Sequence, residues 1–127
     1  MRNLSRRAFL KSATAATVAA SAFRGWAAQK TERVLIASNS PNGILAYDWD
    51  GETGTLKAAG AAAKIDMVDW IAFSPDKKYL FAACELDSFN GKPTGEVACF
   101  RMTGGDLIPL TTRNSASKGT CNVAVDK

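Results

Sequence analysis

The feature that most constrains the fold is an internal repeat with a spacing of about 52 residues. Three short segments recur in the same order with a nearly constant offset. The pairs are ILAY (44–47) with VACF (97–100), GTL (54–56) with GDL (105–107), and WIAF (70–73) with NVAV (122–125). Self-similarity of this kind indicates one supersecondary unit that the chain uses more than once.

The segments between the turns read as short β-strands. They are apolar runs of about 4 to 9 residues, separated by turns rich in Gly, Pro, Asn, Asp and Ser. The central pair flanks Ser74-Pro75-Asp76, where Pro sets the backbone angle of a tight turn. Pro109 favours an edge strand for its run, because proline cannot donate to a sheet ladder. We expect strands at 33–39, 44–49, 55–63, 70–73, 79–84, 95–102, 106–113 and, beginning another unit, 120–125.

These patterns predict an all-β fold. Strands at roughly 8–12 residue spacing are typical of sandwiches, barrels and propellers, and the repeat favours a propeller of four-stranded antiparallel blades. One complete blade spans 70–113, preceded by the second to fourth strands of another blade and followed by the start of a third. Because propellers close with about 4–8 blades, we expect the chain to be the front part of a longer protein.

The N-terminus predicts an exported protein. Ser5-Arg6-Arg7 followed by Phe9-Leu10-Lys11 matches the twin-arginine export signal, and an Ala- and Thr-rich, mildly apolar segment follows it. That segment is too short and too polar to span a bilayer stably. We therefore expect a signal peptide at 1–28, a propeller segment at 29–127, the twin-arginine translocase as a partner, and a periplasmic or secreted product. The alternative is an amphipathic N-terminal helix.

The charge distribution argues against nucleic-acid binding. The chain has a net charge of +4, yet residues 1–28 hold five of its 16 basic residues and no acidic one. The remainder carries 11 basic against 12 acidic residues, so the body has no basic footprint for a polyanion.

The ordered segments resemble the lactonase family of seven-bladed propellers, typified by the propeller-type bacterial 6-phosphogluconolactonases. The family's Ile-x-x-Tyr-x-x-Asp strand and Thr-Gly-x-Leu turn are matched at 44–50 and 53–56. Its Ser-Pro-Asp turn, Tyr-Leu-x-x-x-x-Glu strand and Gly-x-Val-x-x-Phe strand are matched at 74–76, 79–85 and 95–100. Its Gly-x-Pro-Cys-His-x-x-Val-Asp segment is matched in part at 119–126, with Thr120 in place of proline and Asn122 in place of histidine.

The resemblance implies a protein whose full-length form hydrolyses a sugar-acid lactone, with a small lactone or sugar as its partner, and the N-terminal signal predicts that this protein is exported. It also implies that the family's catalytic groups lie mostly in later blades. Two alternatives stay open: a non-enzymatic periplasmic propeller that binds a ligand or a protein, and an inactive truncated piece.

Lactone hydrolysis needs a base or an activated water and a donor for the oxyanion. We expect these groups on the face formed by the second-to-third-strand loops and the blade-to-blade loops. The catalytic candidates are Glu85, at a strand end, and Asn122, which can donate a hydrogen bond but cannot act as a base. The ligand-binding candidates are Asp66, Asp69, Lys92 and Lys118. Each has an ordinary structural alternative, such as a solvated loop charge or a turn cap.

The body has no histidine, no Cys-x-x-Cys pair and no Gly-rich phosphate loop, so we expect neither a metal site nor a cofactor. Cys84 and Cys99 are predicted on neighbouring strands. Export leaves two alternatives for them, a disulfide or, as we favour, buried free thiols.

Overall fold

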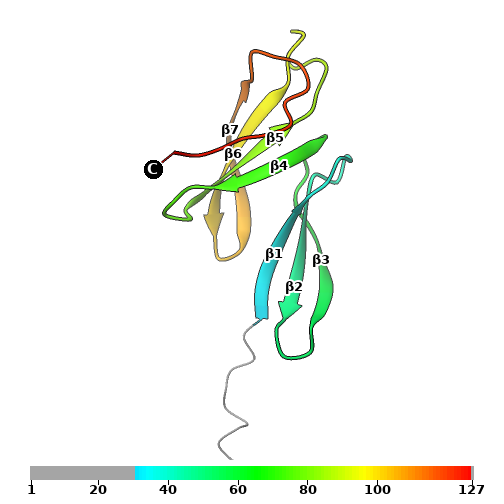
Figure 1. Ribbon diagram of the computed structural model, residues 1–127, viewed down its shortest axis with the longest axis vertical. Coiled ribbons are helices and arrows are strands. Elements are labelled where there is room, and N and C mark those ends of the chain that lie inside the picture. The colour runs from blue at the N-terminus through cyan, green and yellow to red at the C-terminus, as the bar shows by residue number, and fades with distance from the viewer. Residues whose placement is uncertain (1–30, 127) are drawn as a thin grey trace, which may run out of the picture. The chain divides into compact units, whose positions relative to one another are not determined.

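The structure is a computed structural model that describes residues 31–126 (Figure 1). These residues form seven strands and no helix, arranged in two antiparallel sheets. None of them belongs to a helix that is long and apolar enough to cross a membrane. The predicted signal peptide lies outside the described residues.

The first sheet has three strands in the order β1-β2-β3. They are β1 (Thr31–Ala37), β2 (Ile44–Asp50) and β3 (Thr55–Ala63). The turn between β2 and β3 is built by Asp50, whose carboxylate accepts the N–H of Glu52 at 2.9 Å, and by Gly54, at φ 70°. These are the second, third and fourth strands predicted for the earlier blade.

The second sheet has four strands in the order β4-β5-β6-β7. They are β4 (Val68–Phe73), β5 (Tyr79–Cys84), β6 (Glu96–Thr103) and β7 (Asp106–Asn114). Ser74 closes the turn between β4 and β5, because its hydroxyl accepts the N–H of Tyr79 at 3.0 Å and donates to Asp76 at 2.6 Å. Pro109 lies in β7, at the edge of the sheet, as predicted.

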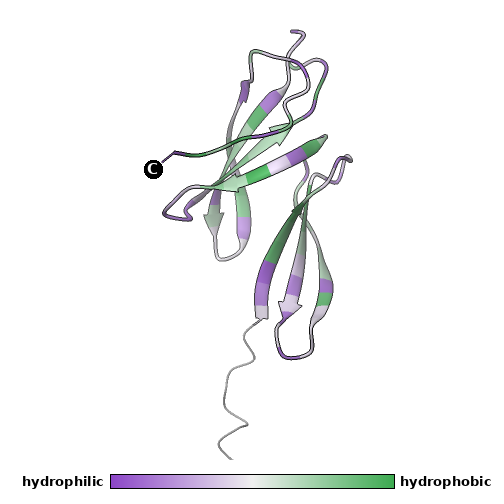
Figure 2. Cartoon of the chain, viewed as in Figure 1, coloured by the Kyte–Doolittle hydropathy of each residue, from purple (hydrophilic) through white to green (hydrophobic). Residues whose placement is uncertain are grey.

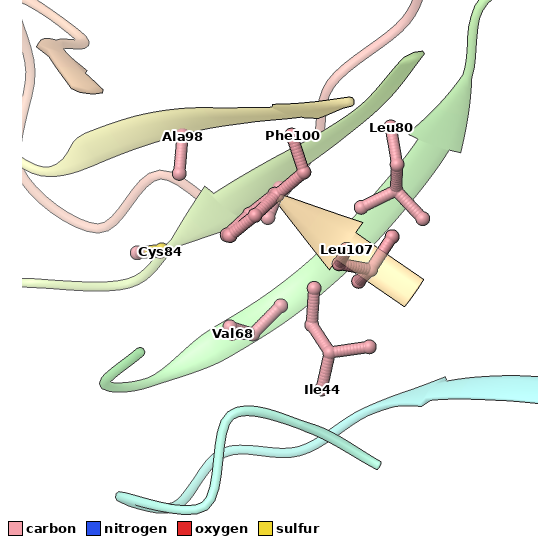
Figure 3. Close-up of a cluster of buried hydrophobic side chains, with 8 residues drawn as sticks. Ile44, Val68, Leu80, Cys84, Ala98, Phe100 and Leu107 are labelled. Carbon is pink, nitrogen blue, oxygen red and sulfur yellow. The ribbon is translucent and has the colours of Figure 1, made fainter. Parts of the chain in front are cut away.

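The core lies on one face of the second sheet. Alternation along β5 and β6 sends Leu80, Ala82, Ala98 and Phe100 to that face, where all four are buried. Ile44, from the first sheet, is fully buried in the same cluster, and Figure 3 shows it directed toward Val68 and Leu107. Figure 2 shows that hydrophobic residues occupy mainly the strands, whereas the turns are mostly hydrophilic.

All seven strands were predicted with ends within two residues of those observed. The eighth was wrong, because residues 120–126 form no strand. A strand needs a hydrogen-bonded neighbour, and the innermost strand of a blade pairs with the strand that follows it in the sequence. No such partner is present among the described residues, so the apolar pattern at 120–125 is not sufficient to form one.

Candidate functional site

Four connections meet at one end of the strands, and together they form what we call the loop face: residues 38–43, 64–67, 85–95 and 115–119. Backbone hydrogen bonds hold three of them together. The N–H of Glu85 donates to the Met67 carbonyl at 2.8 Å, and the N–H of Gly95 donates to the Ser117 carbonyl at 2.6 Å. The fourth connection ends at Gly43, which lies against Ile65. The predicted grouping of these loops is therefore present.

The loop face brings together some of the predicted site residues. Glu85 lies beside residues 66–67 through its bond to Met67, so Asp66 and Glu85 belong to adjacent segments. The N–H of Gly119 donates to the Leu86 carbonyl at 3.3 Å, which places Lys118 next to the same loop. The six predicted residues Asp66, Asp69, Glu85, Lys92, Lys118 and Asn122 are all exposed, so each is accessible to a ligand.

The backbone is irregular where the chain enters β4. Met67 has φ 54°, an uncommon conformation for a residue with a long side chain. The β4–β5 register then shifts between Val68 and Trp70, which makes Asp69 the extra residue of a β-bulge. Bulges re-aim side chains and occur often beside active sites. Here the bulge leaves Asp69 exposed while Val68 is buried.

Glu96 is a buried carboxyl that the prediction missed. It begins β6 opposite Cys84 of β5 and is only 7% exposed. Burial raises the pKa of Glu96, and the nearby charge of Asp66 raises it further, whereas a hydrogen bond with Thr112 opposes the rise. Burial, Glu96 and Asp66 together raise the pKa of the Cys84 thiol to about 12. Glu96 is thus the one described acidic residue that combines burial with a perturbed pKa, a combination found often in functional sites.

A cluster of hydroxyl groups fixes the segment that precedes Asn122. Thr94 is buried, and its hydroxyl lies 3.4 Å from that of Ser115 and 3.3 Å from the Ser117 carbonyl. The Thr120 hydroxyl donates to Ser115. A side chain at Gly95 would collide with Thr120, since a Cβ there would lie 2.4 Å from its hydroxyl oxygen. Thr120 therefore holds the segment by hydrogen bonding.

The loop face also contains a cavity of about 200 Å³ at the outer edge of the second sheet. It lies between the tip of the β5–β6 loop and the end of β7. Two cationic side chains are among its lining residues, which are Phe89, Asn90, Lys92, Thr112, Arg113 and Asn114. Of the predicted ligand-binding residues, only Lys92 lines this cavity.

The three cysteines are free, so the alternative of a Cys84–Cys99 disulfide was wrong. Cys84 pairs with Glu96 in the β5–β6 register, whereas Cys99 pairs with Phe81. Cys99 lies three positions after Glu96 along β6, and because this offset is odd, the two thiols point to opposite faces of the sheet. Residues 31–126 contain no group of three or more His, Cys, Asp or Glu side chains that could hold a metal ion.

Comparison with known proteins identifies the family. Residues 27–127 match the model of the lactonase family, described as a seven-bladed β-propeller. The chain belongs to the lactonase family. No curated protein matches it.

Two solved structures are similar to this lactonase-family chain. One is a protein from Bacteroides uniformis assigned as a 6-phosphogluconolactonase, with a TM-score of 0.64, 22% identity and 77% of this chain covered. The other is a periplasmic gluconolactonase from Pseudomonas aeruginosa, with a TM-score of 0.59, 21% identity and 71% covered. This chain spans 29% and 26% of their respective lengths. At these identities the similarity establishes the propeller fold.

Proposed function

We propose that this chain is the propeller segment of an exported lactonase, which in its full-length form hydrolyses a sugar-acid lactone. The observation that carries the proposal is the family match over residues 27–127. The names of the two similar structures, a 6-phosphogluconolactonase and a gluconolactonase, support the same substrate class. The periplasmic location of the second agrees with the twin-arginine sequence at the N-terminus.

The reaction needs little from the protein beyond positioned polar groups. Water adds to the lactone carbonyl carbon while a base accepts its proton, and an oxyanion forms. The bond from the carbonyl carbon to the ring oxygen then breaks, and the ring oxygen takes up a proton to become a hydroxyl. The products are an open hydroxy acid, which ionises at neutral pH, and the regenerated base.

The exposed carboxylates of the loop face supply this base in our proposal. Asp66 and Glu85 lie on adjacent segments, and Asp69 is presented by the bulge of β4. Asn122 follows the segment held by Thr120 and supplies an amide donor for the oxyanion or for a sugar hydroxyl. Glu96 is buried, so we give it no direct contact with the substrate.

The test is a lactone-opening assay on the full-length protein. Acid release from glucono-δ-lactone and from its 6-phosphate is followed against the spontaneous rate in the same buffer. Loss of a general base costs about 10²- to 10⁴-fold, so we expect a fall in this range for Asp66→Asn, Asp69→Asn or Glu85→Gln. Asp87→Asn is the control, because Asp87 is an exposed acid in the same loop. A wild-type rate equal to the buffer rate contradicts the proposal.

Export is tested separately from activity. Replacing Arg6 and Arg7 with lysines is expected to retain the protein in the cytoplasm, whereas replacing Lys30 and Arg33 with glutamine leaves export unchanged. Cell fractionation measures both. Equal amounts of the twin-lysine variant and the wild type in the periplasm contradict twin-arginine export.

A second candidate function is ligand binding without catalysis. The cationic cavity beside Lys92 and Arg113 favours it, since the chemistry above requires no such cavity. A full-length protein that binds the open acid and yet leaves the lactone rate at its buffer value is the result expected for this alternative.

A further inference from the structure

The cavity of about 200 Å³ lies away from the proposed lactone site. Its lining comes from the hairpin at the tip of the β5–β6 loop and from the end of β7. In the strand order β4-β5-β6-β7, β7 is the edge strand opposite β4, which contains Asp69 and follows Asp66. A ligand in the cavity would therefore bind at the outer rim of the blade.

The hairpin that carries Lys92 is well defined. Phe89 and Lys92 exchange two backbone hydrogen bonds, of 3.0 and 3.1 Å, across the two-residue turn Asn90-Gly91. Both turn residues have positive φ, 53° and 72°, as a type I′ turn requires, and Asn-Gly is the preferred pair for that turn. The turn thus fixes the backbone of Lys92 beside β7 before any ligand binds, which reduces the entropic cost of binding.

The positive charges of two lining residues favour an anionic ligand. Lys92 and Arg113 are both exposed, and no acidic residue lines the cavity, although the buried Glu96 carboxyl is hydrogen-bonded to the lining residue Thr112. The side-chain ion pairs found within residues 31–126 are Arg33–Asp48 and Lys78–Asp76, which use neither of these cations. An arginine and a lysine can together engage a phosphate or carboxylate, the first through a planar fork and the second as a point charge.

The neutral lining groups favour a polar ligand of small size. The carboxamide oxygen of Asn114 accepts the N–H of Ala116 at 3.3 Å, so the remaining polar group of that side chain is a donor. The ring of Phe89 adds an apolar wall. A volume of 200 Å³ corresponds to roughly seven water molecules at about 30 Å³ each, less than drug-sized ligands require.

We infer that this cavity is a binding site for a small oxyanion, the phosphate or carboxylate group of a sugar-sized compound. The inference does not depend on the proposed lactonase activity, because none of the groups invoked there lines the cavity.

The experiment is a titration of the ¹⁵N-labelled full-length protein with inorganic phosphate, gluconate and glucose in separate arms at low ionic strength. We expect phosphate, gluconate or both to shift the amide resonances of Gly91, Lys92 and Asn114, and glucose to shift none of them. The anion that binds more tightly identifies the group recognised. Added salt should weaken binding, because exposed charges are screened.

Two matched double variants decide whether the cavity is responsible. Lys92→Gln with Arg113→Gln is expected to weaken anion binding at least about tenfold, since hydrogen bonds to charged groups are the strong ones. Lys57→Gln with Arg101→Gln removes the same net charge from exposed strand positions and should leave binding unchanged. Circular dichroism verifies that both variants are folded, and Arg113→Lys alone, which keeps the charge, should retain part of the affinity. The inference is overturned if neither anion binds, if glucose binds equally well, or if the two double variants behave alike.

Discussion

At the scale of single residues, Glu96 is the least expected group in the molecule. Along β6, alternation places it on the same face as Ala98 and Phe100, both of which are buried. The burial of Glu96 could therefore have been predicted from the sequence, because it lies two and four positions before two residues of the core. Its proximity to Asp66 could not be predicted, because 30 positions separate the two residues and only the fold brings them together.

The pKa of Glu96 predicts a stability that falls with pH. A carboxyl whose pKa is raised on folding binds protons more tightly in the native state, so it stabilises the fold below its unfolded value of about 4.3. That contribution is lost as pH rises through the raised native value. Glu96→Gln, which cannot ionise, is expected to be more stable than the wild type near pH 7 and to remove this part of the pH slope. Urea unfolding between pH 4 and 8 measures both effects.

Glu85→Gln is the control for this comparison, because Glu85 is exposed. A Glu96→Gln variant that is less stable at pH 7, or that keeps the wild-type pH slope, would contradict a raised native pKa.

At the scale of elements, the glycine closest to the backbone of another segment lies where the β1–β2 turn meets the end of β3. Gly43 has φ 68°, and a Cβ there would lie 2.5 Å from the Ala63 carbonyl oxygen and 2.6 Å from the Ile65 backbone nitrogen. Ile44, the next residue, is fully buried. The sequence predicted the turn from Ser40-Pro41-Asn42-Gly43, but the close approach depends on the β2–β3 pairing.

Gly43→Ala is expected to destabilise the chain by about 2 kcal/mol or more, because it combines positive φ with a collision against backbone atoms. Gly104→Ala is the matched control. Gly104 also has positive φ, at 59°, but a Cβ there meets nothing within 4 Å. We expect the control to cost about 1 kcal/mol, from backbone strain alone. Thermal or urea unfolding measures the difference, and equal losses would show that the close approach is relaxed at little cost.

The strand predicted at residues 120–125, which the structure does not contain, also concerns the scale of elements. The short apolar segment there resembles that of β4, yet β4 has β5 as a hydrogen-bonded partner and residues 120–126 have none among those described. Strand propensity is a preference for a paired, half-buried surface. An apolar sequence pattern therefore predicts a strand even where no neighbouring strand is present to pair with it.

At the scale of the whole molecule, the second sheet leaves two large apolar side chains about half exposed on the face opposite the core. Trp70 lies on that face opposite the fully buried Ala83, and it is 48% exposed. Ile108, opposite Arg101, lies on the same face and is 46% exposed. Exposed apolar patches on a sheet promote association.

We therefore expect the isolated 127-residue chain to self-associate at micromolar to millimolar concentrations. Trp70→Gln with Ile108→Thr should reduce the association, whereas Leu56→Gln, at a residue that is 50% exposed on β3, should not. Light scattering across a concentration series measures it. A wild-type chain that stays monomeric and melts sharply and reversibly would contradict this prediction.

The sequence by itself determined the seven strands, their antiparallel order in two blade-like sheets, and the lactonase family, because each depends on local patterns and on an ordered repeat. It also placed Asp66, Glu85 and Lys118 on one loop face, since strand order fixes which loops share an end of the sheet. Only the tertiary structure decided that Glu96 is buried and that Cys84 and Cys99 lie on opposite faces of the sheet. It also decided that Lys92 and Arg113 line the same cavity. These depend on register and side-chain packing between distant segments, and a shift of one residue would reverse every side chain to the other face.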